Sequence, residues 1–317
     1  MESPIRIGIS SCLLGENVRW DGGHKRDDFL LGTVAPHVTW VPVCPEVESG
    51  MGVPRPTVRL ELDADGVVRM VDPKSGKDHT TSMTRYSKAR VRALADENLD
   101  GYVLKKDSPS CGMERVRLNP ANGMPVRKGV GLFATELIAR FPLLPIEEEG
   151  RLNDPNLREN FFERVFAYRR LKSLFSQRWK PADLVRFHTA EKMLLLAHDP
   201  QGYRALGRMV AAVKSSPHGD LEEQYSHAFM AVMCKLATPR KHVNVLQHMQ
   251  GHFSEQLDAP ARAELGALVE DFGHGLVPLI APVTLFRHYV RRFAVDYLAG
   301  QTYLEPHPKE LMLRNHA

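Results

Sequence analysis

In the first half of the chain, short apolar runs alternate with longer stretches in which apolar residues recur at helical spacing. The runs Ile5–Ile9, Val38–Val43 and Gly101–Leu104 are short and apolar, as strands buried on both faces of a parallel sheet are. Met83–Asn98 and Gly131–Phe141 have the period of amphipathic helices. This alternation of strands and helices predicts a three-layer, Rossmann-like α/β domain.

Two more segments complete the predicted α/β domain. Residues 59–71 alternate between apolar and polar positions around Asp63-Ala64-Asp65-Gly66, so we expect two strands joined by a turn. Leu143–Ile146 is a last short strand, and the acidic stretch Glu147–Gly150 follows it. We place the domain boundary there, which gives a first domain over residues 1–150.

Residues 151–317 show helical spacing almost throughout. Asn153-Asp154-Pro155 is a signal for the start of a helix. We predict helices at Leu157–Phe175, Ala182–His198, Pro200–Ser215, Glu222–Lys235, His242–Phe253, Pro260–His274 and Pro282–Ala299. Strand signals are nearly absent, so the second domain is predicted to be an all-α bundle.

Composition describes an ordinary globular protein and favours a reducing compartment. The chain has 317 residues, 43% hydrophobic and 25% charged, which fits two domains. Four cysteines in this length argue against a disulfide framework. No apolar run approaches the roughly 20 residues that span a bilayer, and no secretory signal is visible. We therefore expect a cytoplasmic protein with no membrane partner.

Charge is distributed unevenly between the two halves. Residues 1–150 hold 20 Lys and Arg against 21 Asp and Glu, a net charge of −1, whereas residues 151–317 hold 22 against 17, a net charge of +5. The second half also holds 11 of the 14 histidines. A positive half favours a polyanionic partner, although such a charge is also common in proteins that bind no nucleic acid.

Clustered cations and histidines in the helical half offer two further interpretations. Lys241-His242, Arg287-His288 and Arg291-Arg292 are the best grouped cations for contact with an RNA backbone. Glu223 and His227 lie four residues apart on a predicted helix, but no second Glu-x-x-His pair accompanies them. The pattern therefore argues against a carboxylate-bridged metal site in the bundle.

Three cysteines each follow a predicted strand and lie among loop-forming residues. Cys12, Cys44 and Cys111 are 32 and 67 residues apart, so any shared site has to be assembled by the fold. Loops at the carboxyl ends of parallel strands converge on one crevice, and thiolates prefer zinc or iron–sulfur clusters. Buried, inert thiols are the simpler alternative. Cys234 lies on an apolar helical stretch, where we expect a core position.

The residues around these cysteines also resemble a known family. Cys-Leu-Leu-Gly with Trp-Asp-Gly, Cys-Pro-Glu followed by Gly-Val-Pro-Arg-Pro, and Lys-x-x-Ser-Pro-Ser-Cys-Gly are similar to the motifs of thiouracil desulfidases. The resemblance covers about residues 5–146. It implies a [4Fe–4S] cluster held by Cys12, Cys44 and Cys111, with the fourth iron free for the sulfur of the substrate.

The second half resembles a helical domain that is often fused to such desulfidases. Its marks are the segments that begin at Phe187 and Lys241 and the closing segment that begins at Glu305. The fused form is similar to bacterial tRNA 4-thiouridine desulfidases. The resemblance implies tRNA as the partner, and non-redox conversion of 4-thiouridine to uridine.

Such a reaction needs a general acid or base, and three residues near the cysteines are candidates. Glu46 lies two residues after Cys44, Ser108 three residues before Cys111, and Asp21 in the turn after Cys12. Turn stabilisation is the alternative role for Ser108 and Asp21.

Three other functions remain open at this point. The first alternative is an enzyme that acts on free thiolated uracil bases or nucleotides. The second is an enzyme that inserts sulfur into tRNA, and the third is a zinc-stabilised RNA-binding protein. Sulfur insertion normally needs nucleotide activation of the base, and the sequence has no Gly-rich phosphate loop of the P-loop kind. The sequence does not indicate the oligomeric state.

Overall fold

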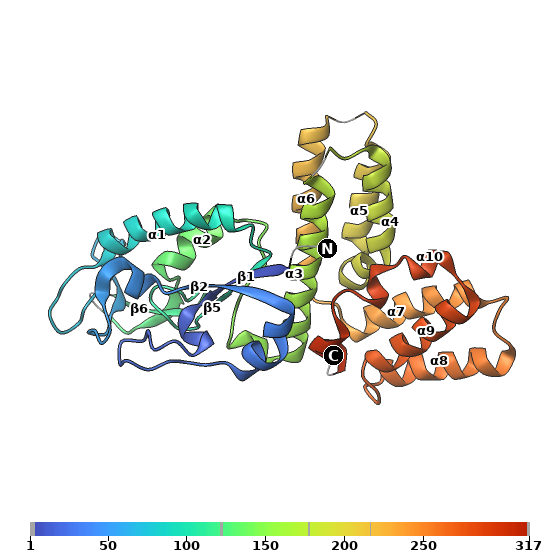
Figure 1. Cartoon of the computed structure of the whole chain (residues 1–317), viewed down its shortest axis with the longest axis horizontal. Helices are drawn as coiled ribbons and strands as arrows, with labels where there is room; N and C mark the ends of the chain where they lie inside the picture. Colours follow the sequence, from blue (N-terminus) through green and yellow to red (C-terminus); the bar gives the residue numbers. More distant parts are fainter. Residues whose placement is uncertain (1–3, 121–122, 177, 216, 316–317) are drawn as a thin grey trace. The chain divides into compact units, whose positions relative to one another are not determined.

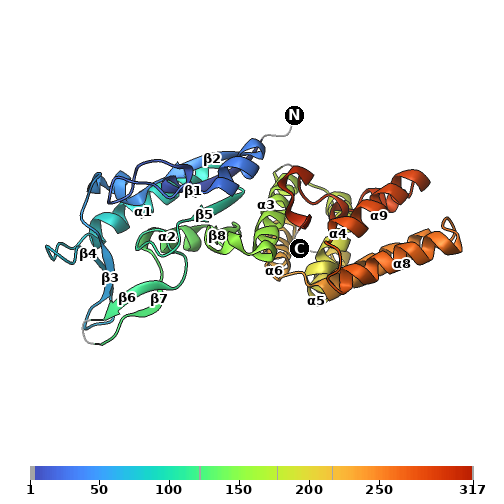
Figure 2. The same ribbon diagram turned by 90° about the horizontal axis from the view of Figure 1, so that it is seen from below.

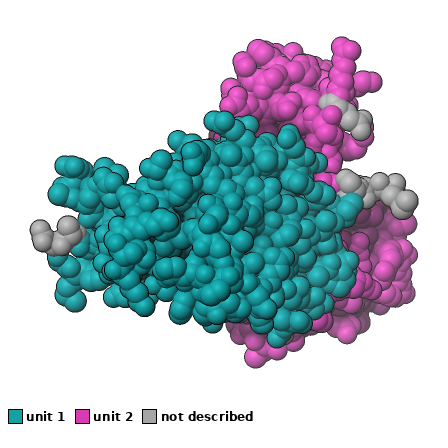
Figure 3. Space-filling model, turned by 60° about the vertical axis from the view of Figure 1, so that its left-hand side comes forward, with its two compact units in different colours: residues 1–153 teal, residues 154–317 magenta. Residues whose placement is uncertain are grey.

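The chain forms two compact units. The computed structural model describes residues 4–120, 123–176, 178–215 and 217–315. The units are Met1–Asn153 and Asp154–Ala317, coloured separately in Figure 3. The division falls three residues after Gly150, the end of the acidic stretch.

A four-stranded parallel sheet forms the centre of the first unit. Its order is β2-β1-β5-β8, so β1 (Ile5–Ser10) pairs with β2 (Val38–Val43) on one side and β5 (Gly101–Leu104) on the other. β8 (Ile146–Glu148) completes the sheet beside β5 (Figure 2). The predicted α/β class is confirmed.

Two helices cover one face of this sheet. α1 (Thr80–Leu94) connects β2 to β5, α2 (Leu132–Arg140) precedes β8, and the two pack side by side (Figure 1). α1 buries Met83, Ser87, Val91 and Leu94, a stripe with helical spacing. Because parallel crossovers are right-handed, α1 and α2 share a face, and the short helical turns of residues 30–37 lie on the other.

A second, smaller sheet has the order β4-β3-β6-β7. β3 (Arg59–Leu62) and β4 (Val68–Val71) form the predicted hairpin, and β6 (Val116–Pro120) pairs with β3 in parallel. β7 (Val126–Gly129) pairs with β6. The sequence analysis missed β6 and β7 because both are short, and because β6 contains Asn119 and Pro120 while β7 has exposed Arg127 and Lys128. The pairing of β6 with β3 joins the segment after Cys111 to the segment after Cys44.

The second unit is all-α, as predicted. Its helices are α3 (Pro155–Phe175), α4 (Pro181–His198), α5 (Pro200–Ala211), α6 (His218–Met233), α7 (Pro239–Gln250), α8 (Ala259–Gly273), α9 (Ile280–Phe293) and α10 (Asp296–Ala299). The side chains of Asp154, Asp199 and Asp258 cap α3, α5 and α8. Among the described residues, no helix is both long and apolar enough to cross a membrane.

The expected core position of Cys234 is wrong. α6 ends at Met233, so Cys234 occupies the C-cap, where the chain leaves the helix, and its side chain is exposed. The helix that buries the apolar face therefore ends one residue before Cys234.

Gly131 connects the fold to one of the cysteine loops and generates a first prediction. A Cβ at Gly131 would lie 2.4 Å from the Ser110 carbonyl oxygen and 2.9 Å from the Cys111 nitrogen. We expect Gly131→Ala to lower the free energy of unfolding of the first unit by about 1–3 kcal/mol, because backbone has to move. Urea unfolding followed by circular dichroism measures this loss. Gly32→Ala is the control, since a Cβ there meets nothing within 4 Å, and equal midpoints for both variants would contradict the prediction.

Candidate functional site

A cavity of about 370 Å³ opens at the carboxyl edge of the parallel sheet, and Cys12, Cys44 and Cys111 all line it. Cys12 lies in the short helical turn after β1, Cys44 directly follows β2, and Cys111 lies seven residues after β5. From β1 the chain continues to β2 on one side of the sheet and later returns to β5 on the other side, so the strand order reverses beside β1. Ligands of open α/β sheets bind at such a point. The structure therefore brings the three predicted cysteines together.

Cys12 and Cys111 are buried and Cys44 is partly buried, and none of the three forms a disulfide. Burial raises the pKa of Cys12 to about 11, with Lys105 acting in the opposite direction. Burial also raises the pKa values of Cys44 and Cys111. Burial outweighs the nearby cations, so the protonated form of each thiol is favoured and a bound metal would replace these protons.

The loop that carries Cys111 is a tight turn built on Ser108. Ser108 Oγ accepts hydrogen bonds from the backbone nitrogens of Ser110 (3.3 Å) and Cys111 (3.1 Å). The Gly112 nitrogen donates to the Ser108 carbonyl oxygen at 2.8 Å. A Cβ on Gly112 would lie 2.9 Å from that same oxygen, so this turn requires glycine. The turn-stabilising role considered for Ser108 is therefore present in the structure.

Glu46 lies in the cavity wall and is held by a buried arginine. Arg55 donates to Glu46 Oε2 from Nε (3.1 Å) and Nη2 (2.5 Å), and its side chain is 3% exposed. Its Nη1 donates to the carbonyl oxygens of Val18 and Gly52, both at 2.9 Å. Every contact presents a donor to the carboxylate, which leaves Glu46 an acceptor in a fixed orientation.

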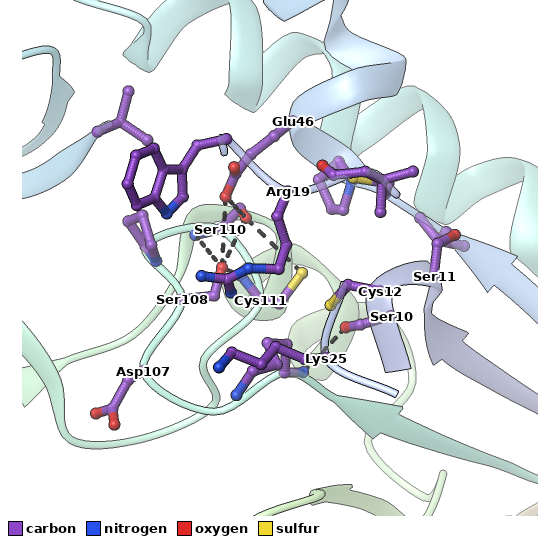
Figure 4. A pocket seen from close by; sticks show the side chains of 18 of the residues that line it. Ser10, Ser11, Cys12, Arg19, Lys25, Glu46, Asp107, Ser108, Ser110 and Cys111 are labelled. Carbon is purple, nitrogen blue, oxygen red and sulfur yellow. Dashed lines mark hydrogen bonds between the residues drawn. The ribbon is translucent and has the colours of Figure 1, made fainter. Parts of the chain in front are cut away.

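Ser110, which the sequence analysis missed, makes the closest hydroxyl contact with Glu46. Ser110 Oγ lies 2.7 Å from Glu46 Oε1 and 3.7 Å from Cys111 Sγ (Figure 4). Ser108 Oγ lies 3.5 Å from the same carboxylate oxygen and 3.0 Å from Ser110 Oγ. Both serines belong to the Ser-Pro-Ser-Cys motif, but spacing does not indicate which hydroxyl faces Glu46. Arg55 was also missed, although it lies within Gly-Val-Pro-Arg-Pro.

Asp21 occupies a different environment from the other two candidates. Its Oδ1 accepts a hydrogen bond from the Gly23 nitrogen at 3.0 Å and lies 3.5 Å from Arg19 Nε. The Gly23 hydrogen bond lowers the pKa of this exposed carboxyl group. Asp21 is not among the described residues that line the cavity, and its contacts are those of a turn.

Cations and one tryptophan also line the cavity. They are Arg19, Trp20, Lys25, Lys105 and Lys106. The Trp20 side chain is 45% exposed, which is unusual for so large an aromatic residue. Lys105 pairs with Glu149, whereas Lys25 and Lys106 have no ion pair within the described part of the chain. The cavity therefore combines a soft, sulfur-rich floor with positive charge and an aromatic surface.

The donor set fits a soft metal centre with an open position. Three sulfur atoms from separate loops share one cavity, and they are the ligand type that selects zinc or iron–sulfur clusters. Three protein ligands leave a further coordination position for another molecule. Fold and site together define an α/β protein with a three-thiol candidate metal centre.

The comparisons identify the family. Residues 7–149 match the model of the 2-thiouracil desulfurase family, and the chain belongs to this family. Residues 192–308 match a second family, described as a protein of unknown function (DUF1722).

Several relatives match about half of the chain. The uncharacterized protein YbgA of Escherichia coli (strain K12) is 33% identical over 153 residues, which cover 48% of this chain and 90% of that protein. The uncharacterized protein YbbK of Bacillus subtilis (strain 168) is 29% identical over 154 residues, which cover 47% and 98%. A solved structure of the [4Fe-4S]-dependent thiouracil desulfidase TudS is 29% identical, covers 47% of this chain and 94% of its own, and has a TM-score of 0.38.

Thiol burial predicts the order in which the cysteines react. In reduced, metal-free protein at pH 8, we expect iodoacetamide to modify Cys12 roughly 100-fold more slowly than a thiol of ordinary pKa, because the thiolate is the reacting form. The rate at Cys12 should rise about tenfold per pH unit towards its pKa of about 11. Peptide mass spectrometry measures each site, with exposed Cys234 as the internal control. Equal rates at Cys12 and Cys234 at pH 8 would contradict the burial described here.

Proposed function

We propose that the chain removes the sulfur of 4-thiouridine in tRNA and leaves uridine, with Cys12, Cys44 and Cys111 holding a [4Fe–4S] cluster. The observation that carries this proposal is that the three thiols and the carboxylate of Glu46 share one cavity. Membership of the 2-thiouracil desulfurase family supports thiolated uracil as the chemical class of the substrate. The reaction we propose consumes water and releases hydrogen sulfide, so no electrons are exchanged.

A cluster bound to three thiolates supplies an iron with an open position, which is a soft acceptor for thiocarbonyl sulfur. The residues of the chain provide the proton transfers. Glu46 accepts a proton from the water whose oxygen adds to C4 of the base. Ser110 lies between Glu46 and Cys111, where its hydroxyl passes that proton towards the departing sulfur. Arg55 keeps the Glu46 carboxylate oriented for both steps.

The mouth of the cavity suits a nucleotide. The exposed ring of Trp20 offers a stacking surface for a flat pyrimidine. Lys25 and Lys106 provide positive charge for phosphate groups beside it. These features support a thiolated nucleotide as the substrate, in preference to a bare base.

The helical unit supports docking of tRNA through its charge and not through its motifs. The net charge of +5 over residues 151–317 favours a polyanion. His288, Arg291 and Arg292 are exposed on the last turns of α9. The grouped cations Lys241 and His242, by contrast, are engaged inside the unit.

Lys241 and His242 both form hydrogen bonds within the helical unit. Lys241 Nζ donates to the carbonyl oxygens of His198 (2.6 Å) and Leu236 (3.0 Å). His242 is buried, with Nδ1 2.9 Å from the Tyr303 hydroxyl. We therefore place the RNA contact on α9 and not on α7.

A free thiolated nucleotide is the second candidate substrate. The described residues that line the cavity all belong to the first unit, and its volume of about 370 Å³ is within the range of small-molecule sites. In that case the helical unit has another partner.

Glu46 provides the sharpest test of the proposed chemistry. Glu46→Gln should keep the cluster, measured as iron and sulfide content, and lower turnover by roughly 10²–10⁴-fold, because the amide cannot accept the proton. Asp21→Asn is the matched control, with an exposed carboxylate in a turn, and its turnover should stay within a few fold. Full activity of Glu46→Gln would eliminate Glu46 as the base.

The substrate is tested by anaerobic incubation of cluster-loaded protein with bulk bacterial tRNA, followed by nucleoside mass spectrometry. We expect 4-thiouridine to decrease while uridine and sulfide increase. Cys111→Ala should lose the cluster and the activity, whereas Cys234→Ala should keep both. An unchanged 4-thiouridine content with an intact cluster, together with turnover of 4-thiouridine monophosphate, would identify the free nucleotide as the substrate.

A further inference from the structure

Segments far apart in the sequence meet on one helix of the second unit. Glu159 and Glu163 are one turn apart on α3, and both are buried, at 5% and 1% exposure. His198 reaches them from the end of α4, and His307 and Arg314 reach them from the C-terminal segment. His198 lies in the marked segment that begins at Phe187, and His307 and Arg314 lie in the marked segment that begins at Glu305. The proposed desulfuration uses none of these residues.

Arg314 bonds both carboxylates. Its Nε lies 3.1 Å from Glu159 Oε1, and its Nη2 lies 2.8 Å from Glu163 Oε1. Its Nη1 donates to the Tyr303 carbonyl oxygen at 2.6 Å. This guanidinium balances one of the two buried negative charges. The second charge faces His198 and His307, and an unpaired buried carboxylate is strongly unfavourable.

The two histidines turn the same ring nitrogen towards the carboxylates. Nδ1 of His307 lies 3.1 Å from the Pro308 carbonyl oxygen, and Nδ1 of His198 lies 2.6 Å from that of Lys235. A carbonyl oxygen can only accept, so each Nδ1 carries a proton. In a neutral ring, Nε2 is then a lone pair. Nε2 of His198 lies 3.0 Å from Glu163 Oε2, and this contact is a hydrogen bond only when that nitrogen also carries a proton, because a carboxylate oxygen accepts.

His307 Nε2 is the feature that points to a ligand. It is buried and has no hydrogen-bond partner. It lies within 4.8 Å of a carboxylate oxygen of Glu159 and of Glu163, and these two oxygens are equally close to each other. A lone pair and two carboxylates that face one another require a positive charge between them.

The surroundings match those of a metal centre. Histidines that bind metals donate their other nitrogen to a backbone carbonyl or carboxylate, and carboxylate ligands are hydrogen-bonded in turn. His307 has the first feature, and Arg314 supplies the second to both glutamates. A cavity of about 20 Å³, enough for one water, lies against Glu159, Glu163 and His198, and His307 is not among the described residues that line it.

We infer that Glu159, Glu163 and His307 bind a divalent transition-metal ion, with zinc the best match to one imidazole and two carboxylates. The ion ties the C-terminal segment to α3 and so stabilises the helical unit. Nothing in this inference depends on the proposed desulfuration.

The test measures zinc binding to the full chain in which Cys12, Cys44 and Cys111 are alanine, so that thiolates cannot bind the metal. After removal of metals, we expect one zinc ion to bind per chain and to raise the melting temperature of the helical unit. His307→Gln should weaken zinc affinity by roughly 100-fold or more and abolish the thermal shift. His188→Gln is the matched control, since His188 is also buried in this unit with an unpartnered Nε2.

Glu159→Gln is a second variant, in which the amide oxygen can still accept the hydrogen bond from Arg314. It should weaken zinc affinity as His307→Gln does, and circular dichroism shows whether each variant is folded. Two results would overturn the inference. One is a full chain that binds no zinc and is stable without it, as expected if protons supply the missing positive charge. The other is zinc binding that both variants leave unchanged.

Discussion

Parallel pairing of β1 with β2 on one side and β5 on the other is the constraint on which the candidate active site depends. Because the strands are parallel, their carboxyl ends lie at one edge, and the loops with Cys12, Cys44 and Cys111 leave from that edge. Cysteines 32 and 67 residues apart in the sequence share one cavity because these strands are neighbours and the loops after them turn towards the same edge. The second sheet reinforces this arrangement, since β3 and β6 pair in parallel beyond two of the three loops.

Burial and charge act together at this edge. The environment that raises the pKa values of the three thiols also makes a bare carboxylate unfavourable beside them. Arg55 compensates the charge of Glu46, because its guanidinium pairs with the carboxylate. Its Nη1 donates the remaining hydrogen bonds to backbone carbonyl oxygens. A metal cation bound by the three thiols would in the same way stabilise their deprotonated form. The cavity is therefore organised for a positively charged centre beside a carboxylate of fixed orientation.

Sequence predicts this molecule well where the signal is local. Apolar runs end at the residues where strands end, so the cysteine-bearing loops and the change to an all-α unit could be predicted. The failures concern features set by tertiary contacts. β6 and β7 are short strands with little apolar signal, and they form because β6 pairs with the free edge of β3 and β7 pairs with β6. Ser110 faces Glu46 because of how the turn folds, and a helix that ends one residue early exposes Cys234.

The helical unit shows why sequence motifs and binding surfaces need not coincide. The sequence predicts contact with RNA at Lys241 and His242, yet His242 bonds inside the unit, as do His198, His307 and Arg314. Buried polar groups specify a fold because each requires a partner in one place. These residues therefore determine how the C-terminal segment, α4 and α7 assemble around α3. Affinity for a polyanion needs only exposed positive charge, and the charged residues can occupy many positions on a surface. A cationic surface such as that of Arg291 and Arg292 therefore has no strict sequence motif.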